Sequence, residues 1–344
     1  MARFAGIPVR ETDVPAEAWD AIVASSDEAL AFHRRAWVDA ATALEGGENI
    51  SRVYEWEGRR VLVPLIRAGG LLGSAGVAAS LPYGWGFGGI LTEGCVTPSD
   101  VRKAVDDLST VGLTRLSLRP NPLAAQAWAS AVPGRTASVA RTAHVLRLDG
   151  GFERVWADRF TGTARTNVRR AEKSGLTVEV SRTDQAIEAF YQLYEISWSR
   201  WGGQRRYASA TRWLTDRRRE RIEKFTAAAR ALGDDFSIWL ARLGDVPVAA
   251  IVVLSQPGAA SYWRGAMDEA QAGPTRANYL LHKQAIEAAC ESGARVYHMG
   301  DTGTSTSLAQ FKTRFGAQAV EYREYHLERL PITAAMRRVR RILG

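Results

Sequence analysis

The sequence contains few of the residues on which several common kinds of active site depend. Its 344 residues include two cysteines, Cys95 and Cys290, and five scattered histidines. None of these has a metal-ligand spacing such as H-E-x-x-H. This scarcity argues against a metal enzyme, a Cys-His nucleophile pair and a disulfide scaffold, and it favours a reducing cytoplasm. We therefore expect a cytoplasmic protein without a bound metal.

Long apolar runs are missing as well. No run approaches the roughly 20 residues of a membrane-spanning helix. The first residues, MARFAGIPVRETDVP, contain neither the apolar core nor the cleavage site of a signal peptide. Hydrophobic residues make up 46% and charged residues 24%, which is ordinary for a globular protein. A chain of 344 residues is long for one core, so two domains are expected. No integral membrane segment is expected, and the oligomeric state is left open, with a monomer as one possibility.

Lysine is also rare, because only five of the 45 basic residues are not arginine. The net charge of +8 is uneven: residues 1–150 carry a net charge of about −1, and residues 151–344 carry about +9. A polyanionic partner would therefore be met by the second half, although ordinary solvated faces of an arginine-rich protein explain the composition equally well.

The two halves show the same order of expected elements. In the first half a helical region spans about 16–44, and a hairpin, a glycine-rich stretch, a helix from about 98 and two strands follow. The second half has a helix over 184–199, a hairpin turning at Gly244-Asp245, a strand, a helix over 276–292 and two more strands. This duplication predicts two α/β (α+β) domains at 1–149 and 150–319, packed around a shared groove. A strand and basic helix over 320–344 would return to the first domain.

Several segments in this order resemble the Fem family (FemA, FemB and FemX), which consists of tandem GNAT-like domains. They are FHRRAWVDA, SLPYGWGFGGILTE, ARTNVRRAEKSGLTVEV, FYQLYEISWSRWGG, SYWRGAMDEAQAGPTRANYLLHKQAIEAACESGA and HMGDTGTSTSLAQFKTRFG. Fem enzymes transfer amino acids from aminoacyl-tRNA to peptidoglycan precursors, and relatives form peptide bonds in natural-product pathways. The resemblance thus implies an aminoacyltransferase that uses aminoacyl-tRNA as co-substrate and needs no further cofactor.

The resemblance also implies candidate residues for the acyl centre. Lys312 lies between Phe311 and Phe315 in an F-K-x-x-F segment that in Fem-like enzymes is beside the reacting groups, while the two phenylalanines are expected to pack in the core. Tyr262 lies on the strand that lines the acyl site in this fold, so it is either a catalytic residue or an ordinary sheet residue. The residues expected to bind substrate are Arg34, Arg35, Tyr83, Trp85, Arg200, Arg206, Tyr207, Arg264 and Asp301.

Basic residues on one predicted helical face are candidates for binding tRNA phosphates. Arg165, Arg169 and Lys173 are spaced four residues apart, with Arg170 alongside, and arginine suits bidentate phosphate contacts. A solvated face is an equally good interpretation. The run Arg217–Arg221 is expected to be such a solvated face.

The donor is the main alternative that the sequence leaves open. The place where a GNAT enzyme holds the coenzyme A pyrophosphate reads QAGPTRANYLLHK, in which Pro274 lacks an N–H group, and Thr275 and Arg276 replace small residues. This departure weakens the alternative of an acyl-CoA-dependent N-acyltransferase. A third hypothesis is a binding module without catalytic activity.

Overall fold

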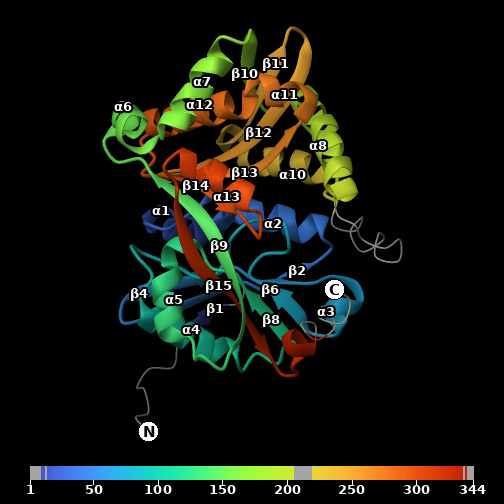
Figure 1. Ribbon diagram of the computed structural model, residues 1–344. Coiled ribbons are helices and arrows are strands. Elements are labelled where there is room, and N and C mark those ends of the chain that lie inside the picture. Colours follow the sequence, from blue (N-terminus) through green and yellow to red (C-terminus); the bar gives the residue numbers. More distant parts are fainter. Residues whose placement is uncertain (1–8, 12–13, 205–218, 336–337, 339–344) are drawn as a thin grey trace. The chain divides into compact units, whose positions relative to one another are not determined.

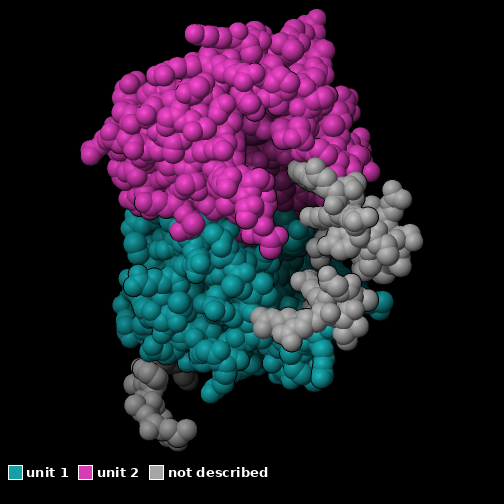
Figure 2. Space-filling view, in the orientation of Figure 1, with its two compact units in different colours: residues 1–143, 320–344 teal, residues 144–319 magenta. Residues whose placement is uncertain are grey.

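The computed structural model describes residues 9–11, 14–204, 219–335 and 338, without the side chains of residues 9–11 and 201–204. The chain forms two compact units, shown in Figure 2. Unit 1 comprises residues 1–143 and 320–344, and unit 2 comprises residues 144–319. The domain ranges and the shared groove expected from the sequence stay predictions. Among the described residues, no helix combines the length and the apolar character needed to cross a membrane.

Unit 1 contains two groups of strands (Figure 1). The four-stranded sheet has the order β1-β3-β4-β7, and the other group has the order β15-β8-β6-β5-β2. The strands are β1 (Val9–Glu11), β2 (Glu48–Asn49), β3 (Arg52–Trp56), β4 (Arg59–Val63), β5 (Ile66–Arg67), β6 (Val77–Ala79), β7 (Leu91–Thr92), β8 (Arg115–Leu118) and β15 (Gln318–Glu328). The helices are α1 (Ala16–Ser25), α2 (Arg35–Leu44), α3 (Gly70–Ser74), α4 (Pro98–Leu108) and α5 (Ala125–Ala131), with short 3₁₀ turns at Ala31–His33 and Pro122–Ala124.

The expected hairpin in unit 1 is confirmed, but the expected helical region over 16–44 is interrupted. Strands β3 and β4 pair across Glu57 and Gly58, which both have positive φ, as a tight hairpin turn requires. Helices α1 and α2 are separate because the chain between them bonds to distant segments. The amide of Asp27 bonds to the carbonyl of Gly94, and the Asn121 side chain donates to the carbonyl of Glu28.

Unit 2 has the strand order β10-β11-β12-β13-β14-β9. Its strands are β10 (Leu176–Ser181), β11 (Phe236–Leu243), β12 (Val246–Gln256), β13 (Ala259–Met267), β14 (Val296–Asp301) and the last part of β9 (Ala137–Arg147). Residues 137–143 of β9 belong to unit 1, and residues 144–147 belong to unit 2. Its helices are α6 (Gly151–Arg154), a π-helical turn (Val155–Arg159), α7 (Gly162–Glu172), α8 (Asp184–Gln204), α10 (Ile222–Leu232), α11 (Glu269–Thr275), α12 (Ala277–Glu291) and α13 (Thr306–Arg314).

Strand β12 shows why unit 2 is layered. Its residues 248–254 are all buried, so both faces of the strand must be covered. Alternate residues Ala249, Ile251 and Val253 belong to the core that includes Leu281 and Ala285 of α12. Helices α8 and α10 contact the sheet as well, and α7 packs against α12 (Figure 1). The antiparallel β11–β12 hairpin turns at Gly244-Asp245, as expected.

Strands β13 and β14 pair over only part of their length. The parallel register joins Ala259–Ser261 to Val296–His298, and the pairing of these described strands ends there. Beyond that point the bulge at Trp263, opposite Val252 and Val253, bends β13. Residues 262–267 of β13 and 299–301 of β14 therefore keep backbone groups that this parallel ladder does not use.

Candidate active site

Lys312 is positioned by a helix that is anchored at both ends. At the N-terminus of α13 the Ser305 hydroxyl accepts a hydrogen bond from the Leu308 amide at 3.2 Å. At the C-terminus the carbonyl of Arg314 accepts hydrogen bonds from the amide and the hydroxyl of Thr161, which also caps α7. These anchors orient the helix so that the Lys312 amine lies under the end of β14.

The Lys312 amine donates to two backbone carbonyls, those of Gly300 at 2.9 Å and Asp301 at 2.7 Å. Lys103, Lys224 and Lys283, in contrast, donate to glutamate carboxylates at 2.7 to 2.9 Å. The Lys312 side chain is 1% exposed. Burial lowers its pKa to about 8, against the opposing attraction of the Asp301 carboxylate. The ammonium form therefore still predominates at neutral pH.

The aromatic residues on either side of Lys312 are packing residues, which confirms the expectation for Phe311 and Phe315. Phe315 is fully buried, and its ring packs edge-on against Phe160 and stacks on Tyr279. Phe311 is partly buried and packs against the same core. A Cβ at Gly316 would approach the Arg159 carbonyl to 2.5 Å, so the residue after this frame must be glycine for the chain to pass.

Two histidines that sequence reasoning did not assign lie in the electrostatic environment of Lys312. His282 of α12 has its pKa lowered to about 3, first by burial and then by the Lys312 charge. Its Nδ1 lies 3.2 Å from the Tyr297 hydroxyl. His144 of β9 has its pKa lowered by the same two causes, and its Nδ1 lies 2.6 Å from the Thr302 hydroxyl. Both imidazoles are therefore neutral at pH 7.

Tyr262 lies on β13 beside this cluster. Its ring packs edge-on against His282 with the centroids 4.7 Å apart. Burial raises the pKa of its hydroxyl to about 12, in spite of the nearby Arg264 charge. A Cβ at Gly265 would lie 2.3 Å from that hydroxyl, so the glycine leaves the space into which the tyrosine folds. The hydroxyl is thus a neutral donor near the parting of β13 and β14.

Arg264 and Arg200, two residues predicted to bind substrate, are engaged by carboxylates. Arg264 Nε donates to Glu220 at 2.6 Å, and the guanidinium lies over the Trp263 ring. Burial tends to raise the pKa of Glu220, but Arg264 and Lys224 outweigh it and lower the value to about 2. Arg200 pairs with Glu269. Arg206 and Tyr207 lie outside the described residues, and Asp301 is the last residue of β14.

The predicted acceptor residues of unit 1 fall into two groups. Trp85 is completely buried, and its indole N–H donates to Glu45 at 2.8 Å. Arg35 donates to the carbonyl of Val14 and pairs with Asp39 at 3.3 Å. Tyr83 is 69% exposed, and Arg34 is half-buried at the start of α2.

The glycine-rich stretch of unit 1 serves packing. A Cβ at Gly86, whose φ is +96°, would lie 2.5 Å from the ring of Phe32. A Cβ at Gly89 would lie 2.7 Å from Pro120. The close approach that these glycines permit is therefore to the protein's own core.

The four basic residues proposed to bind tRNA phosphates differ in their surroundings. Arg165 donates to the carbonyls of Trp156, Ala157 and Phe160 at 2.6 to 3.1 Å, where the π-helical turn ends. Arg169, Arg170 and Lys173 are exposed at the C-terminal end of α7. The structure thus gives Arg165 a structural role and leaves the other three on the solvent face.

The segment that would cradle a coenzyme A pyrophosphate comprises the end of α11, Arg276 and the start of α12. The amides of Ala270 and Ala272 bond to Asp268, and the amide of Arg276 bonds to the carbonyl of Gly273 at 3.4 Å. Arg276 then adopts a left-handed conformation with φ +59° and begins α12. This places a bulky side chain at the position where a phosphate loop needs open backbone N–H groups.

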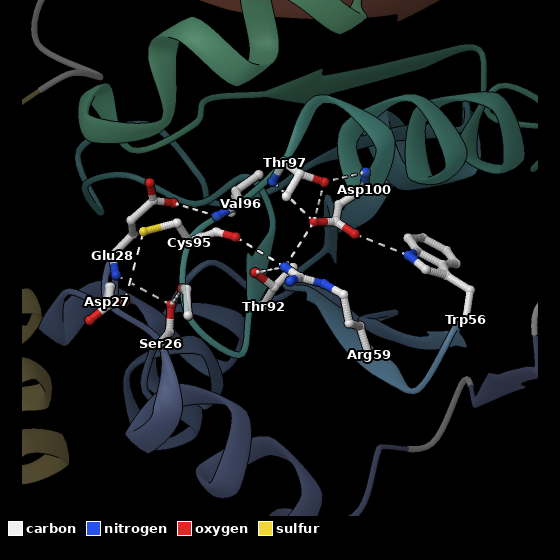
Figure 3. Close-up of polar contacts among 11 residues, drawn as sticks. Ser26, Asp27, Glu28, Trp56, Arg59, Thr92, Cys95, Val96, Thr97 and Asp100 are labelled. Atoms are coloured by element: carbon white, nitrogen blue, oxygen red, sulfur yellow. Dashed lines mark hydrogen bonds and ion pairs between the residues drawn. The ribbon is translucent and has the colours of Figure 1, made fainter.

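A second buried polar cluster, in unit 1, is shown in Figure 3. Asp100 accepts hydrogen bonds from the amide and hydroxyl of Thr97, from Arg59 at 3.1 Å and from the Trp56 indole at 3.1 Å. Arg59 also donates to Thr92 and to the carbonyl of Cys95. Every partner either caps α4 or ties it to the β3–β4 hairpin, so this cluster is structural.

Comparison with known proteins supports the fold. The family described as Acetyltransferase (GNAT) domain matches residues 158–313. The crystal structure of FemX superposes with a TM-score of 0.65 at 13% identity and covers 92% of this chain and 96% of FemX. The C-terminal domain (DUF2156) of a putative lysylphosphatidylglycerol synthetase from Agrobacterium fabrum gives 0.55 at 12% identity, covering 93% and 94%.

A conserved protein of unknown function from Bacteroides thetaiotaomicron VPI-5482 also gives a TM-score of 0.55, at 11% identity, covering 93% of this chain and 99% of that one. No curated protein sequence matches the chain. The resemblance that the motifs predicted is confirmed: the chain has the tandem GNAT-like fold of FemX, an acyltransferase fold, and its GNAT match contains Lys312.

Proposed function

We propose that this protein is an aminoacyltransferase that transfers an amino acid from aminoacyl-tRNA to the amine of a small molecule, natural product or peptidoglycan precursor. The observation that carries the proposal is the buried Lys312 ammonium under the parting strands β13 and β14. Lowering its pKa from 10.5 to about 8 corresponds to a burial cost on the order of 3 kcal/mol. A buried cation whose pKa stays lowered in spite of a nearby carboxylate is a candidate functional group.

The reaction needs positioning and charge stabilisation more than a strong base. The acceptor nitrogen attacks the ester carbonyl carbon, the new N–C bond forms, and the C–O bond to the terminal ribose breaks. Negative charge develops on the carbonyl oxygen and then on the leaving ribose oxygen, which takes up a proton. The Lys312 ammonium supplies positive charge for both stages. Two of its three N–H groups bond to Gly300 and Asp301, which holds its direction.

The proton that the acceptor nitrogen loses requires an acceptor in turn. His144 suits this role because its imidazole is neutral and its orientation is held by Thr302. Thr302 is the residue after Asp301. The His144 imidazole and the Lys312 amine are therefore hydrogen-bonded to adjacent residues of one turn. Tyr262, protonated up to high pH, would serve as a hydrogen-bond donor to the acyl carbonyl.

The choice of donor rests on helix α11. The amides of Ala270, Gln271 and Ala272 bond to Asp268, and Pro274 contributes no N–H group. This supports tRNA over coenzyme A as carrier of the acyl group, with phosphate contacts from the exposed Arg169, Arg170 and Lys173. The second candidate is an acyl-CoA-dependent N-acyltransferase. The match of residues 158–313 to the acetyltransferase family favours it.

Purified protein incubated with a mixture of charged tRNAs, across a salt series and with coenzyme A as competitor, tests the proposal. We expect binding that weakens steeply with salt and is insensitive to coenzyme A, followed by transfer of the amino acid to an added amine. Lys312→Met should retain tRNA binding and lose the transfer. Tight binding of coenzyme A without binding of charged tRNA would replace the proposal with the second candidate.

A further inference from the structure

Unit 1 contains a cavity of about 860 Å³ that the motifs did not indicate. It is bounded by the C-terminal end of α4, the start of β8, the first residues of β9 and the second half of β15. Its described lining residues fall within 108–138 and 323–334, so none belongs to the Lys312 cluster. A space of this size suits a single organic ligand.

The floor of the cavity is apolar. Leu108 and Leu116 are 3% and 1% exposed and belong to the hydrophobic core of unit 1. Leu113 and Leu327 pack against the same core from the cavity side, and Leu330 adds an exposed apolar side chain. These leucines offer contacts to hydrocarbon. Polar side chains also line the cavity, among them Ser109, Thr136, Ser138, His326 and Thr333.

The rim of the cavity is positively charged. Arg135, Arg323 and Arg329 are exposed around it, and Arg323 is oriented by a hydrogen bond to the Ser138 hydroxyl at 3.1 Å. The lining contains one carboxylate, Glu328. That carboxylate pairs with Arg115 at 3.3 Å and accepts two hydrogen bonds from Thr333 at 2.6 and 3.0 Å.

We propose that this cavity binds an anionic amphiphile, whose hydrocarbon body contacts the leucine floor and whose carboxylate or phosphate head binds the rim arginines. Forked guanidinium groups suit both head groups, because two parallel N–H groups meet two oxygens. Within the described part of the chain no ion pair is found for Arg135, Arg323 or Arg329, and the carboxylate of Glu328 is paired with Arg115, so the rim favours anions over cations. The proposal stands apart from the acyl-transfer function and does not rest on it.

Titration calorimetry on the whole protein with alkyl phosphates below their micelle concentrations tests the proposal. We expect dodecyl phosphate to bind at one site, and decyl phosphate, which is two CH₂ groups shorter, to bind about 15-fold more weakly, because each buried CH₂ contributes roughly a fourfold gain. Inorganic phosphate and dodecyltrimethylammonium should not bind in the same concentration range. Equal binding of the two chain lengths, or binding of the cation, would overturn the assignment, as would no binding of dodecyl phosphate.

Surface variants test the head-group contact without disturbing the fold. The double variant Arg323→Gln with Arg329→Gln should weaken dodecyl phosphate binding at least tenfold. Arg102→Gln, an exposed arginine of α4 that does not line the cavity, is the matched control and should leave binding unchanged. Equal effects of the double variant and the control would indicate nonspecific attraction to a basic protein and would refute the site.

Discussion

The two buried polar clusters of this protein differ in how their charges are matched. In unit 1 the Asp100 carboxylate meets the Arg59 guanidinium, a helix cap and an indole N–H group, so charge and hydrogen bonds are satisfied together (Figure 3). In unit 2 the Lys312 ammonium donates to two backbone carbonyls, and the Asp301 carboxylate attracts it without fully offsetting the cost of burial. Burial, and secondarily the Lys312 charge, lowers the pKa of two nearby imidazoles. The arrangement around Asp100 stabilises the fold. The arrangement around Lys312 retains a buried positive charge whose desolvation is only partly compensated.

This difference teaches where to look for function in a chain with many arginines. Arg264 and Arg165, both candidates from the sequence, are matched by Glu220 and by helix-terminal carbonyls. Lys312 is the buried cation whose pKa is displaced farthest from its ordinary value among the described residues with a resolved shift. The comparison yields four predictions, which follow in order of expected effect.

The largest effect should come from Lys312→Met. The variant removes the charge but preserves approximately the length and the apolar character of the unbranched hydrocarbon stem of lysine. We expect the rate of acyl transfer to fall about 10²- to 10³-fold, as when a single charge-stabilising donor is lost. The free energy of unfolding should change by no more than about 2 kcal/mol, because the carbonyls lose a donor while a buried charge disappears. Transfer assays and urea unfolding measure the two quantities, and unchanged transfer would make Lys312 a packing residue.

The pH dependence of stability should also identify Lys312. Its pKa is about 8 in the folded protein and 10.5 when unfolded, so below pH 8 both states are charged and the folded state bears the full burial cost. As the pH rises from 8 to 10.5 the folded protein loses the proton first, and this cost is relieved. The unfolding free energy of the wild type, relative to Lys312→Met, should therefore rise by up to about 3 kcal/mol across this window. A pH-independent difference would contradict the lowered pKa.

Substitution of Asp100 in unit 1 should lower stability, whereas substitution of Lys312 should mainly lower activity. Asp100→Ala removes the carboxylate half of the capping box that Asp100 forms with the N-cap Thr97 of α4, and it removes the partner of Arg59, whose side chain is 36% exposed. We expect a loss of about 2 to 3 kcal/mol in the free energy of unfolding, from the cap and the charged hydrogen bonds together. Asp106→Ala on the same helix is exposed and should cost less than about 0.5 kcal/mol. Similar losses in the two variants would mean that the cluster contributes no special stability.

Local patterns predicted the fold more fully than they predicted the site. The turns at Glu57-Gly58 and Gly244-Asp245 and the cap of α4 depend on neighbouring residues, so they can be recognised along the chain. The break between α1 and α2 depends on partners about 70 and 90 residues away, and it was missed. His144 and Thr302 are 158 residues apart in the sequence, so no local spacing predicts their hydrogen bond. The role of Lys312 stays a prediction, drawn from the resemblance of its local F-K-x-x-F segment to Fem-like sequences.

The smallest effects should separate the arginines of α7. Arg165→Met removes three hydrogen bonds to carbonyls and should cost about 1 to 2 kcal/mol of stability, because those acceptors lose a charged donor. Arg169→Met changes an exposed side chain and should alter stability by less than about 0.5 kcal/mol.

The effect on binding of charged tRNA should be larger for Arg169→Met than for Arg165→Met, the reverse of the effect on stability. If Arg169 contacts one phosphate, Arg169→Met reduces the slope of log affinity against log salt by about 1, whereas Arg165→Met leaves the slope unchanged. Measurements of both variants at matched salt concentrations decide the point. A loss of slope in Arg165→Met alone would show that a guanidinium bonded to carbonyls can still meet the RNA. The contrast between Arg165, which is bonded to carbonyls, and the exposed Arg169 would then not predict which residue of α7 binds RNA.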